Sequence, residues 1–380
     1  MDLPNGGPQR RHQGNRLMPR IAFLLPDFTI GGAERVALTL ITAFVERGIE
    51  VDLVLVRPEG ELLTALPKEV RIVPLGANRL AKSLIPLVRY LRDRKPDAMQ
   101  VRMWPLTLIA IVAQRLAGSA VRIVVSDDSI LSKAYASRGL LHRLILRASI
   151  ALLYPRASAR VAVSEGVADD VVKLGRLDRK SITVLHNPVL FEKPAEASRK
   201  MDWRGDGPRV LAVGCLIPVK NYPLLLSAFA QVLSSRRASL LLVGEGQERA
   251  ELESLAAKLG IADRLTLAGA TTDPAPYYAS ADVFVLSSNN EGFGNVLIEA
   301  MYHGLTPVST DCPTGPGEIL DGGRYGYLVP CRDADALAVA IATACDRPVP
   351  PGLLKARAAE LSGSHIIGNY LDLLLPDSSH

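Results

Sequence analysis

The sequence predicts an α/β protein with two doubly wound parallel sheets that face a cleft. Three observations support this prediction. The chain has 380 residues, more than one hydrophobic core usually organises. Short apolar runs alternate with turns rich in Gly or Asp and with amphipathic helical stretches, which is the pattern of βαβ units. The alternation occurs in both halves, on either side of a segment at 188–208 that is rich in charge, Pro and Gly and is expected to be a linker.

The apolar runs define the expected strands in order. The first run is followed by a helical stretch at 33–47, whose apolar residues Ala37, Leu40, Ile41 and Phe44 share one face. This helix is therefore expected to cover a sheet. In the first half, strands are expected at 20–25, 51–56, 70–75, 97–103, 121–126 and 160–164. In the second half, they are expected at 209–213, 239–243, 265–268, 283–287 and 306–309.

Composition excludes several classes of protein. Residues 1–19 are polar and lack the apolar core of a signal peptide, so we expect a flexible basic head there. The longest clean apolar stretch, at 106–113, is far below the roughly 18 to 20 residues that span a bilayer. The cysteines show no C-x-x-C spacing, which predicts neither a disulfide framework nor a zinc site and favours reduced thiols in a cytoplasmic protein: Cys215, Cys312, Cys331 and Cys345.

Charge is distributed unevenly along the chain. Residues 1–200 carry 31 Lys and Arg against 19 Asp and Glu, while residues 201–380 carry 13 against 20. Basic and apolar residues interleave at 78–95 and 137–156, a pattern of helices that lie on an anionic membrane surface. An ordinary core-facing helix with a solvated basic side explains these two segments equally well. No base-reading motif occurs, so we do not expect nucleic acid as a partner.

Loops that follow the strands are the expected ligand-binding positions, because ligands of open parallel sheets bind beyond the carboxyl ends of the strands. In "PDFTIGGAERVAL" (26–38), Gly31 and Gly32 let the backbone approach a ligand at a helix N-terminus. In "VGCLIPVKNYPLL" (213–225), Lys220 precedes a helix as a point charge suited to phosphate. A tight strand-to-helix turn and an ordinary surface lysine are the alternative interpretations. Neither loop contains the G-x-G-x-x-G pattern of dinucleotide binding.

The stretch "SSNNEGFGNVLIEAM" (287–301) contains two carboxylates. Glu291 lies in a Gly-containing loop, and Glu299 lies in an apolar run that is expected to be helical. An unpaired carboxylate among apolar side chains is costly, so Glu299 needs a partner. Helix side chains lean toward the N-terminus, so both carboxylates can converge on one pocket and accept hydrogen bonds from sugar and ribose hydroxyls. The alternatives for Glu299 are an exposed helix face and an internal salt bridge.

Together these residues resemble the retaining glycosyltransferases of family four, which have the GT-B fold of two Rossmann-like domains. The resemblance rests on E-x7-E at 291–299, on "LVGEGQERAEL" and "YYASADVFVLSS", and on the Lys220 and "GGAER" loops. It covers nearly the whole chain from about residue 20 and is strongest at 209–345. The stretch "STDCPTGPGEILDGGRYGYLVP" (309–330) further resembles members that extend bacterial surface glycans, often on undecaprenyl-diphosphate carriers.

The resemblance implies roles for the E-x7-E region. Glu299 would bind the ribose hydroxyls of a nucleotide-sugar donor. Glu291 would face the donor sugar ring and is an expected catalytic residue. The backbone amides of Phe293, Gly294 and Asn295 would approach the sugar or its phosphate.

Other matching residues would bind the donor diphosphate. Lys220, the second expected catalytic residue, would hold it from a loop that also contains Gly214. Gly31 and Gly32 would close on it from the other domain. Asp128 occupies the acceptor-side position where the family often has a histidine that contacts the donor.

The family organisation also implies domain boundaries. An acceptor-side domain is expected at 20–187 and a nucleotide-sugar-binding domain at 209–362. The final segment, 363–380, is expected to pack back toward the N-terminal domain.

The implied reaction moves a sugar from a nucleotide-diphosphate donor to a glycan or polyprenyl-diphosphate-linked acceptor with retention of configuration, in bacterial surface polysaccharide synthesis. The family needs no metal and no further cofactor, because lysine and helix N-termini neutralise the leaving diphosphate. The pairs Asp127–Asp128 and Asp169–Asp170 are accordingly interpreted as caps or solvated charge. The expected location is the cytoplasm, including the inner face of the cell membrane.

Three positions depart from the family pattern. Cys215 stands where an arginine usually lies beside the diphosphate, Asp128 replaces the histidine, and Gly317 stands where glycan-extending members commonly have arginine. These losses keep a second hypothesis open, in which the chain is a weakened scaffold that binds nucleotide-sugar or a glycan lipid in a synthase complex. A sugar-nucleotide 2-epimerase of the same fold fits less well, because the terminal loops do not support it.

Overall fold

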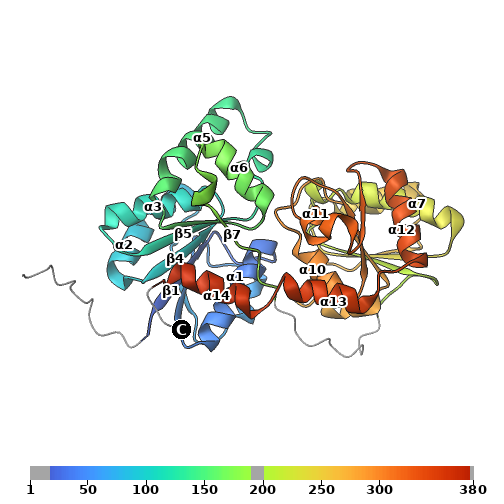
Figure 1. Cartoon of the computed structure of the whole chain (residues 1–380), viewed down its shortest axis with the longest axis horizontal. Coiled ribbons are helices and arrows are strands. Elements are labelled where there is room, and N and C mark those ends of the chain that lie inside the picture. The colour runs from blue at the N-terminus through green and yellow to red at the C-terminus, as the bar shows by residue number, and fades with distance from the viewer. Residues whose placement is uncertain (1–17, 190–200, 377–380) are drawn as a thin grey trace, which may run out of the picture.

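The structure is a computed structural model that describes residues 18–189 and 201–376. Residues 1–17 of the expected head and residues 190–200 of the expected linker therefore lie outside the described residues. Two parallel sheets form two domains that stand side by side (Figure 1), which confirms the predicted fold class. Within the described ranges, no helix combines the length and the apolar character that crossing a bilayer requires.

The N-terminal sheet has seven parallel strands in the order β3-β2-β1-β4-β5-β6-β7. Strand β1, which lies between β2 and β4, reads RIAFLL and is buried on both faces, as the continuous apolar run predicts. All six expected strands are present with ends shifted by at most two residues, and the two-residue strand β7 was not predicted. The strands are β1 (Arg20–Leu25), β2 (Glu50–Leu55), β3 (Arg71–Pro74), β4 (Ala98–Arg102), β5 (Arg122–Asp127), β6 (Ala159–Ala162) and β7 (Thr183–Val184).

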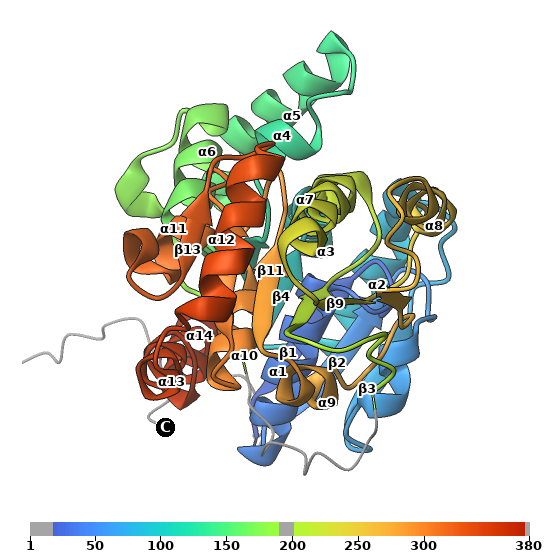
Figure 2. The ribbon, with the colours of Figure 1, turned by 90° about the vertical axis from the view of Figure 1, so that its right-hand side faces the viewer.

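The helices of this domain cover both faces of the sheet (Figures 1 and 2). The first helix buries Ala37, Leu40, Ile41 and Phe44, the stripe expected from sequence. The helices are α1 (Gly32–Glu46), α2 (Leu84–Arg94), α3 (Leu106–Ala117), α4 (Leu131–Ala134), α5 (Leu140–Leu153) and α6 (Glu165–Gly175), with short 3₁₀ turns η1 (Glu61–Ala65), η2 (Leu80–Ser83), η3 (Tyr154–Arg156) and η4 (Arg179–Ser181).

The C-terminal sheet has six parallel strands in the order β10-β9-β8-β11-β12-β13. Five were expected, whereas β13 was missed because its three residues follow a glycine-rich stretch. The strands are β8 (Arg209–Val213), β9 (Ser239–Val243), β10 (Leu265–Leu267), β11 (Val283–Leu286), β12 (Thr306–Thr310) and β13 (Tyr327–Val329). The helices are α7 (Tyr222–Ser235), α8 (Arg249–Lys258), α9 (Ala275–Ser280), α10 (Asn295–Tyr302), α11 (Pro316–Ile319), α12 (Ala334–Asp346) and α13 (Pro351–Glu360), with η5 (Pro218–Lys220) and η6 (Asp321–Gly323).

The last helix, α14 (Ser364–Leu374), returns to the first domain. It lies beside β4 and β5, while the preceding α13 lies against α10 of the second domain (Figure 1). Tyr370 is fully buried in the first core, and the Arg122 guanidinium donates to the Leu373 carbonyl at 2.6 Å. The chain thus crosses between the domains twice.

Candidate functional site

A cavity of about 310 Å³ lies between the two domains. It is bounded by the loop that leads into α1, the loops after β8 and β9, and the N-terminal half of α10. Six of the expected catalytic and donor-binding residues line it together: Gly31, Gly32, Gly214, Lys220, Asn295 and Glu299. These residues come from both domains, so the cavity is complete only when the domains meet.

Two glycines of this cavity leave little room for a side chain. Gly31 is the N-cap of α1, and a Cβ there would lie 2.2 Å from a carboxylate oxygen of Glu34. Gly214 has φ +154°, a backbone conformation that side chains rarely adopt, and a Cβ there would approach the Tyr222 hydroxyl at 3.0 Å. Both glycines therefore bring bare backbone to the cavity wall, as expected for loops that approach a ligand closely.

Lys220 is paired with Glu291. Its ammonium nitrogen lies 2.7 Å from Oε1 of Glu291, and the Ser288 hydroxyl donates to the same oxygen at 2.5 Å. The Ser287 hydroxyl donates to the Lys220 carbonyl at 2.8 Å and ties the lysine turn to the end of β11. Glu291 itself does not line the cavity. The two expected catalytic side chains therefore meet, with the lysine facing the cavity.

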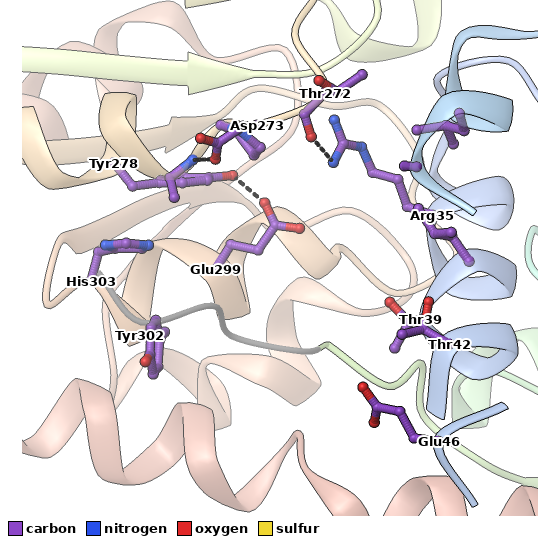
Figure 3. Close-up of a pocket in the computed structure, with 15 residues that line it drawn as sticks. Arg35, Thr39, Thr42, Glu46, Thr272, Asp273, Tyr278, Glu299, Tyr302 and His303 are labelled. Carbon is purple, nitrogen blue, oxygen red and sulfur yellow. Dashed lines mark hydrogen bonds between the residues drawn. The ribbon is translucent and has the colours of Figure 1, made fainter. Parts of the chain in front are cut away.

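Glu299 lies at the meeting point of two cavities. The second one, of about 530 Å³, extends along α1 toward Tyr302 and His303 (Figure 3). The Tyr278 hydroxyl donates to Oε2 of Glu299 at 2.7 Å, and the Tyr278 ring stacks on His303. Burial raises the pKa of Glu299, while the bond from Tyr278 and the charge of Arg35 act in the opposite direction. The hydrogen-bond partner that a carboxylate in this apolar helix was expected to need is thus the Tyr278 hydroxyl. The other carboxylate oxygen of Glu299 points away from Tyr278 toward the cavities (Figure 3).

The start of α10 contacts the segment between the sheets. Phe293 is buried and stacks on His186 at 4.5 Å between ring centroids, and the Asn187 amide donates to Oδ1 of Asn295 at 3.2 Å. Gly294 caps the helix with φ +107°. Sequence reasoning missed His186 and Asn187. Their only signal was two polar side chains in "VLHNPV" directly after an apolar run.

Asp128 does not line either cavity. Its carboxylate is buried in an ion pair with the fully buried Arg102, whose guanidinium also contacts Tyr370 of α14. The contact of Asp128 with the second domain is made by backbone, because a Cβ on Gly292 would lie 1.9 Å from the Asp128 carbonyl oxygen. The Ser164 hydroxyl donates to the Gly292 carbonyl at 2.7 Å beside this contact.

The interpretation of the four aspartates as caps or solvated charge is right for one pair only. Asp169 forms an exposed ion pair with Arg179, and Asp170 accepts from the Ser132 amide in the first turn of α4. Asp127 is instead buried and accepts from the Tyr154 hydroxyl at 2.9 Å. Burial raises the pKa of Asp127 to about 7, because the carboxylate at the end of β5 is removed from water.

Arg35 is a cavity residue that sequence reasoning overlooked. Its guanidinium donates across the gap between the domains to the carbonyl oxygens of Thr271 at 2.7 Å and Thr272 at 3.1 Å. Figure 3 shows the bond to Thr272. It lines both cavities. The signal was present in "GGAER", where Arg35 lies one helical turn after Gly31 and therefore on the same side of the helix.

Of the three departures from the family pattern, Cys215 lines the cavity, whereas Asp128 and Gly317 do not. The Cys215 thiol lines the cavity and lies 3.8 Å from the Ile30 carbonyl oxygen. The two cations that line the cavity among the described residues are Arg35 and Lys220. Beside Gly317, the Glu318 carboxylate contacts His186 at 2.7 Å.

Across residues 18–189 and 201–376, no three His, Cys, Asp or Glu side chains gather closely enough to form a site for an ion.

Both halves of the chain are similar to known glycosyltransferases. Residues 30–192 match the family model "Glycosyltransferase Family 4", and residues 207–347 match "Glycosyl transferases group 1". The lipopolysaccharide core biosynthesis glycosyltransferase LpsE of Rhizobium meliloti is 29% identical over 351 residues, covering 90% of this chain and 92% of the relative.

A second relative is the N-acetylgalactosamine-N,N'-diacetylbacillosaminyl-diphospho-undecaprenol 4-alpha-N-acetylgalactosaminyltransferase of Campylobacter jejuni. It is 27% identical and covers 82% of this chain and 86% of the relative. Among solved structures, Anabaena HepE in complex with UDP-glucose superimposes with a TM-score of 0.81 at 21% identity, covering 94% of this chain and all of that one. WaaG, a glycosyltransferase involved in lipopolysaccharide biosynthesis, gives 0.70 at 19% identity, covering 93% and 99%. At these identities the structural likeness establishes the fold.

Proposed function

The chain belongs to the family-four glycosyltransferases with the GT-B fold, and we propose that it moves a sugar from a nucleoside-diphosphate donor to a glycan or lipid-linked acceptor with retention of configuration. The observation that carries the proposal is the convergence of Lys220, Glu299 and the Gly31–Gly32 loop on one cavity between the domains. A cation, a hydroxyl acceptor and bare backbone are the groups that a nucleoside diphosphate requires.

In the proposed complex, each side chain has a defined task. Lys220 binds the diphosphate, and the amides of the Gly31–Gly32 loop approach it from the other domain. Glu299 accepts from the ribose hydroxyls through the oxygen that Tyr278 leaves free. Glu291 accepts from a hydroxyl of the donor sugar and orients Lys220. Arg35 supplies a second positive charge near the cavity and offsets in part the loss that Cys215 represents.

The proposed chemistry depends on charge stabilisation more than on a protein base. The bond from the anomeric carbon to the donor phosphate oxygen breaks, and the acceptor oxygen attacks from the same face. The departing phosphate takes the acceptor proton. Lys220 stabilises the charge that develops on the leaving diphosphate, and removal of one such contact commonly lowers the rate by on the order of 10²-fold. We propose that no metal is needed, since Lys220 and the N-terminus of α10 act in its place.

The acceptor proposal comes from the relatives. One is named for lipopolysaccharide core biosynthesis and the other for transfer to a diphospho-undecaprenol glycan. We infer an acceptor of the same chemical kind, in bacterial surface polysaccharide synthesis on the cytoplasmic side of the membrane. Four cysteines that form no disulfide suit a reducing compartment.

The experiment incubates the purified chain with a panel of UDP- and GDP-sugars and a polyprenyl-diphosphate glycan, with and without EDTA. Transfer that persists in EDTA, with a product whose anomeric configuration by NMR equals that of the donor, is the expected result. Turnover abolished by EDTA refutes the metal-independent mechanism, and an inverted product refutes retention. Nucleotide binding without transfer or hydrolysis would support the scaffold instead, and a donor converted to its 2-epimer would identify an epimerase.

A further inference from the structure

Helix α5 exposes an unusual amount of apolar surface. Five of its side chains are at least half exposed and are named here the α5 face: Leu140 (72%), Leu141 (73%), Leu144 (63%), Ile145 (50%) and Leu152 (61%). Single exposed leucines are ordinary, but five on one 14-residue helix form a contiguous patch. Such a patch marks a surface that contacts something other than water.

The α5 face is separate from the side of the helix that packs on the domain. Leu146 and Ile150 are buried and anchor α5 to the core. At about 100° per residue, the five exposed side chains occupy an arc of roughly 140°, and the two buried residues lie outside that arc. The helix is thus apolar on two sides. The side with Leu146 and Ile150 packs on the domain, and the α5 face is exposed to solvent.

Charge around the α5 face has a single sign. From residue 129 to residue 164 the chain contains no Asp or Glu, and its basic residues are Lys133, Arg138, Arg143, Arg147, Arg156 and Arg160. Arg143 and Arg147 are exposed and lie beside the apolar arc. In the described part of the chain, no carboxylate forms an ion pair with Lys133, Arg138, Arg143 or Arg147. These cations are therefore available to an anionic partner.

A groove joins the two kinds of surface. It has a volume of about 380 Å³ and lies between α4, α5 and α6. Its wall consists of four leucines, two arginines, a serine and a tyrosine: Leu140, Leu144, Leu146, Leu174, Arg143, Arg147, Ser132 and Tyr135. A wall that contains both leucine side chains and guanidinium groups matches a molecule that has a hydrocarbon part and an anionic head.

The location of α5 suits a planar partner. The helix lies at the outer edge of the N-terminal domain and projects beyond its neighbours in both views (Figures 1 and 2). Ser132 of the groove lies four residues after Asp128, whose backbone meets Gly292 of the second domain. A flat surface that contacts α5 is therefore close to the edge of the cleft.

The other basic segment does not share these properties. In α2, Leu87, Val88 and Leu91 are buried, and the exposed large apolar side chain is Ile85. Segment 78–95 therefore behaves as a core-facing helix with a solvated basic side. It provides a basic surface of the same protein without an apolar face, and so a matched control.

We propose that the α5 face and Arg143 and Arg147 dock this protein on a bilayer that contains anionic lipids. The leucines enter the boundary between headgroups and acyl chains, and the arginines bind lipid phosphates. Docking in this manner holds the cleft beside the membrane. That consequence rests on the proposed lipid-linked acceptor, whereas the docking itself does not.

The test measures sedimentation of the full chain with phosphatidylcholine vesicles, with and without phosphatidylglycerol, at low and high salt. We expect salt-sensitive binding to the anionic vesicles alone. Leu141→Gln with Leu144→Gln lowers the partition coefficient about tenfold or more, since glutamine keeps helix propensity and removes apolar burial. Arg143→Gln with Arg147→Gln lowers it about fivefold for each arginine.

Two control variants match these changes. Leu116→Gln with Val339→Gln alters two apolar residues that are 52% and 66% exposed on other helices. Lys82→Gln with Arg89→Gln alters two exposed cations in the segment 78–95. Both controls are expected to sediment as the unchanged chain does. Far-UV circular dichroism and thermal melting identify any variant that has lost its fold.

Three outcomes overturn the proposal. One is no sedimentation of the unchanged chain with anionic vesicles at low salt. Another is an equal loss of binding in the control variants. The third is a dimer in sedimentation velocity that Leu141→Gln with Leu144→Gln disperses without any vesicle binding, which makes the α5 face an interface between two copies. The vesicle assay contains no sugar nucleotide, and nucleotide binding measured on the same samples reports on the proposed function separately.

Discussion

The ammonium nitrogen of Lys220 lies 2.7 Å from a carboxylate oxygen of Glu291. The side chains are 19% and 11% exposed, so each charge is largely shielded from water and depends on the other. In the proposed complex, a donor diphosphate would bring a further anion to the lysine, and the donor sugar would bring hydroxyls to the carboxylate. The proposal therefore predicts that the two residues respond to substrate as one unit.

Lys220→Met is predicted to lower kcat/KM for sugar transfer by about 100-fold, because the leaving diphosphate loses its cation. The variant with both Lys220→Met and Glu291→Gln is predicted to be far less impaired than the sum of the single effects, since coupled residues are not additive. Steady-state kinetics of the four proteins measure this cycle. Lys258→Met, an exposed lysine on α8, is the control. Strict additivity would show that the ion pair has no role in the site.

Tyr278→Phe is predicted to weaken binding of a nucleoside diphosphate by about tenfold, because Glu299 loses the hydroxyl that supports its ionised form. The pKa of Glu299 is already raised by burial and should rise further. Affinity should increase with pH as the carboxylate ionises, and the variant should need a higher pH to reach its plateau. Calorimetric titration with UDP across a pH series gives both quantities.

The matched control for this prediction is Tyr327→Phe, which removes a hydroxyl bonded to the Arg347 carbonyl at 2.7 Å elsewhere in the same domain. An unchanged pH profile in Tyr278→Phe would show that Glu299 does not bind the ribose as a carboxylate.

Arg35→Met is predicted to shift the chain toward a more open form. Its guanidinium makes two hydrogen bonds to Thr271 and Thr272 across the cleft, and bonds from a charged group are each worth about 1.5–3 kcal/mol. The ratio of closed to open molecules should fall tenfold or more, with a larger radius of gyration in small-angle scattering and a higher KM for donor. Arg47→Met, exposed just beyond the end of the same helix, should change neither quantity.

Gly292→Ala is predicted to abolish most activity without loss of stability. A Cβ at this position would lie 1.9 Å from the Asp128 carbonyl oxygen of the other domain, so the domains cannot close to the arrangement seen here. We expect a loss of at least about 100-fold in kcat/KM, comparable to the loss of one charge-stabilising contact. Gly352→Ala, where nothing lies within 4 Å, is the control. Normal turnover in Gly292→Ala would mean that catalysis does not use this closed arrangement.

The raised pKa of Asp127 predicts that the stability of the folded chain depends on pH. Its pKa rises from 3.8 to about 7 on burial, so the folded chain binds a proton more tightly than the unfolded chain. Stability is then greatest at acidic pH and falls as the pH rises from about 4 to about 7, by up to about 4 kcal/mol for this group. Asp127→Asn should flatten that part of the profile of melting temperature against pH.

Asp263→Asn, which alters an exposed carboxylate, provides the reference for the Asp127 profile because it should leave the slope unchanged. A steeper or identical slope in Asp127→Asn would place the pH dependence in other groups.

Much of the fold and part of the site follow from local patterns. The run RIAFLL predicts a strand buried on both faces, and "NVLIEAM" predicts a helix that contains Glu299. Strand β7, with two residues, carries too little pattern to be recognised. Asp127 and Asp128 were expected to be solvated or to cap helices, because nothing local shows that helix α14 and the Arg102 guanidinium bury that end of β5.

By itself, the sequence determined two parallel sheets and a loop with Glu291 followed by a helix with Glu299, because apolar periodicity and a short spacing along the chain are local properties. The tertiary structure alone decided what meets that loop. Arg35 reaches Thr271 across 236 positions of sequence, and Asn187 reaches Asn295 across 108. It also decided that the apolar residues of α5 face outward while those of α2 face the core. Such contacts depend on how two sheets and a returning C-terminal helix pack, and no local pattern encodes that packing.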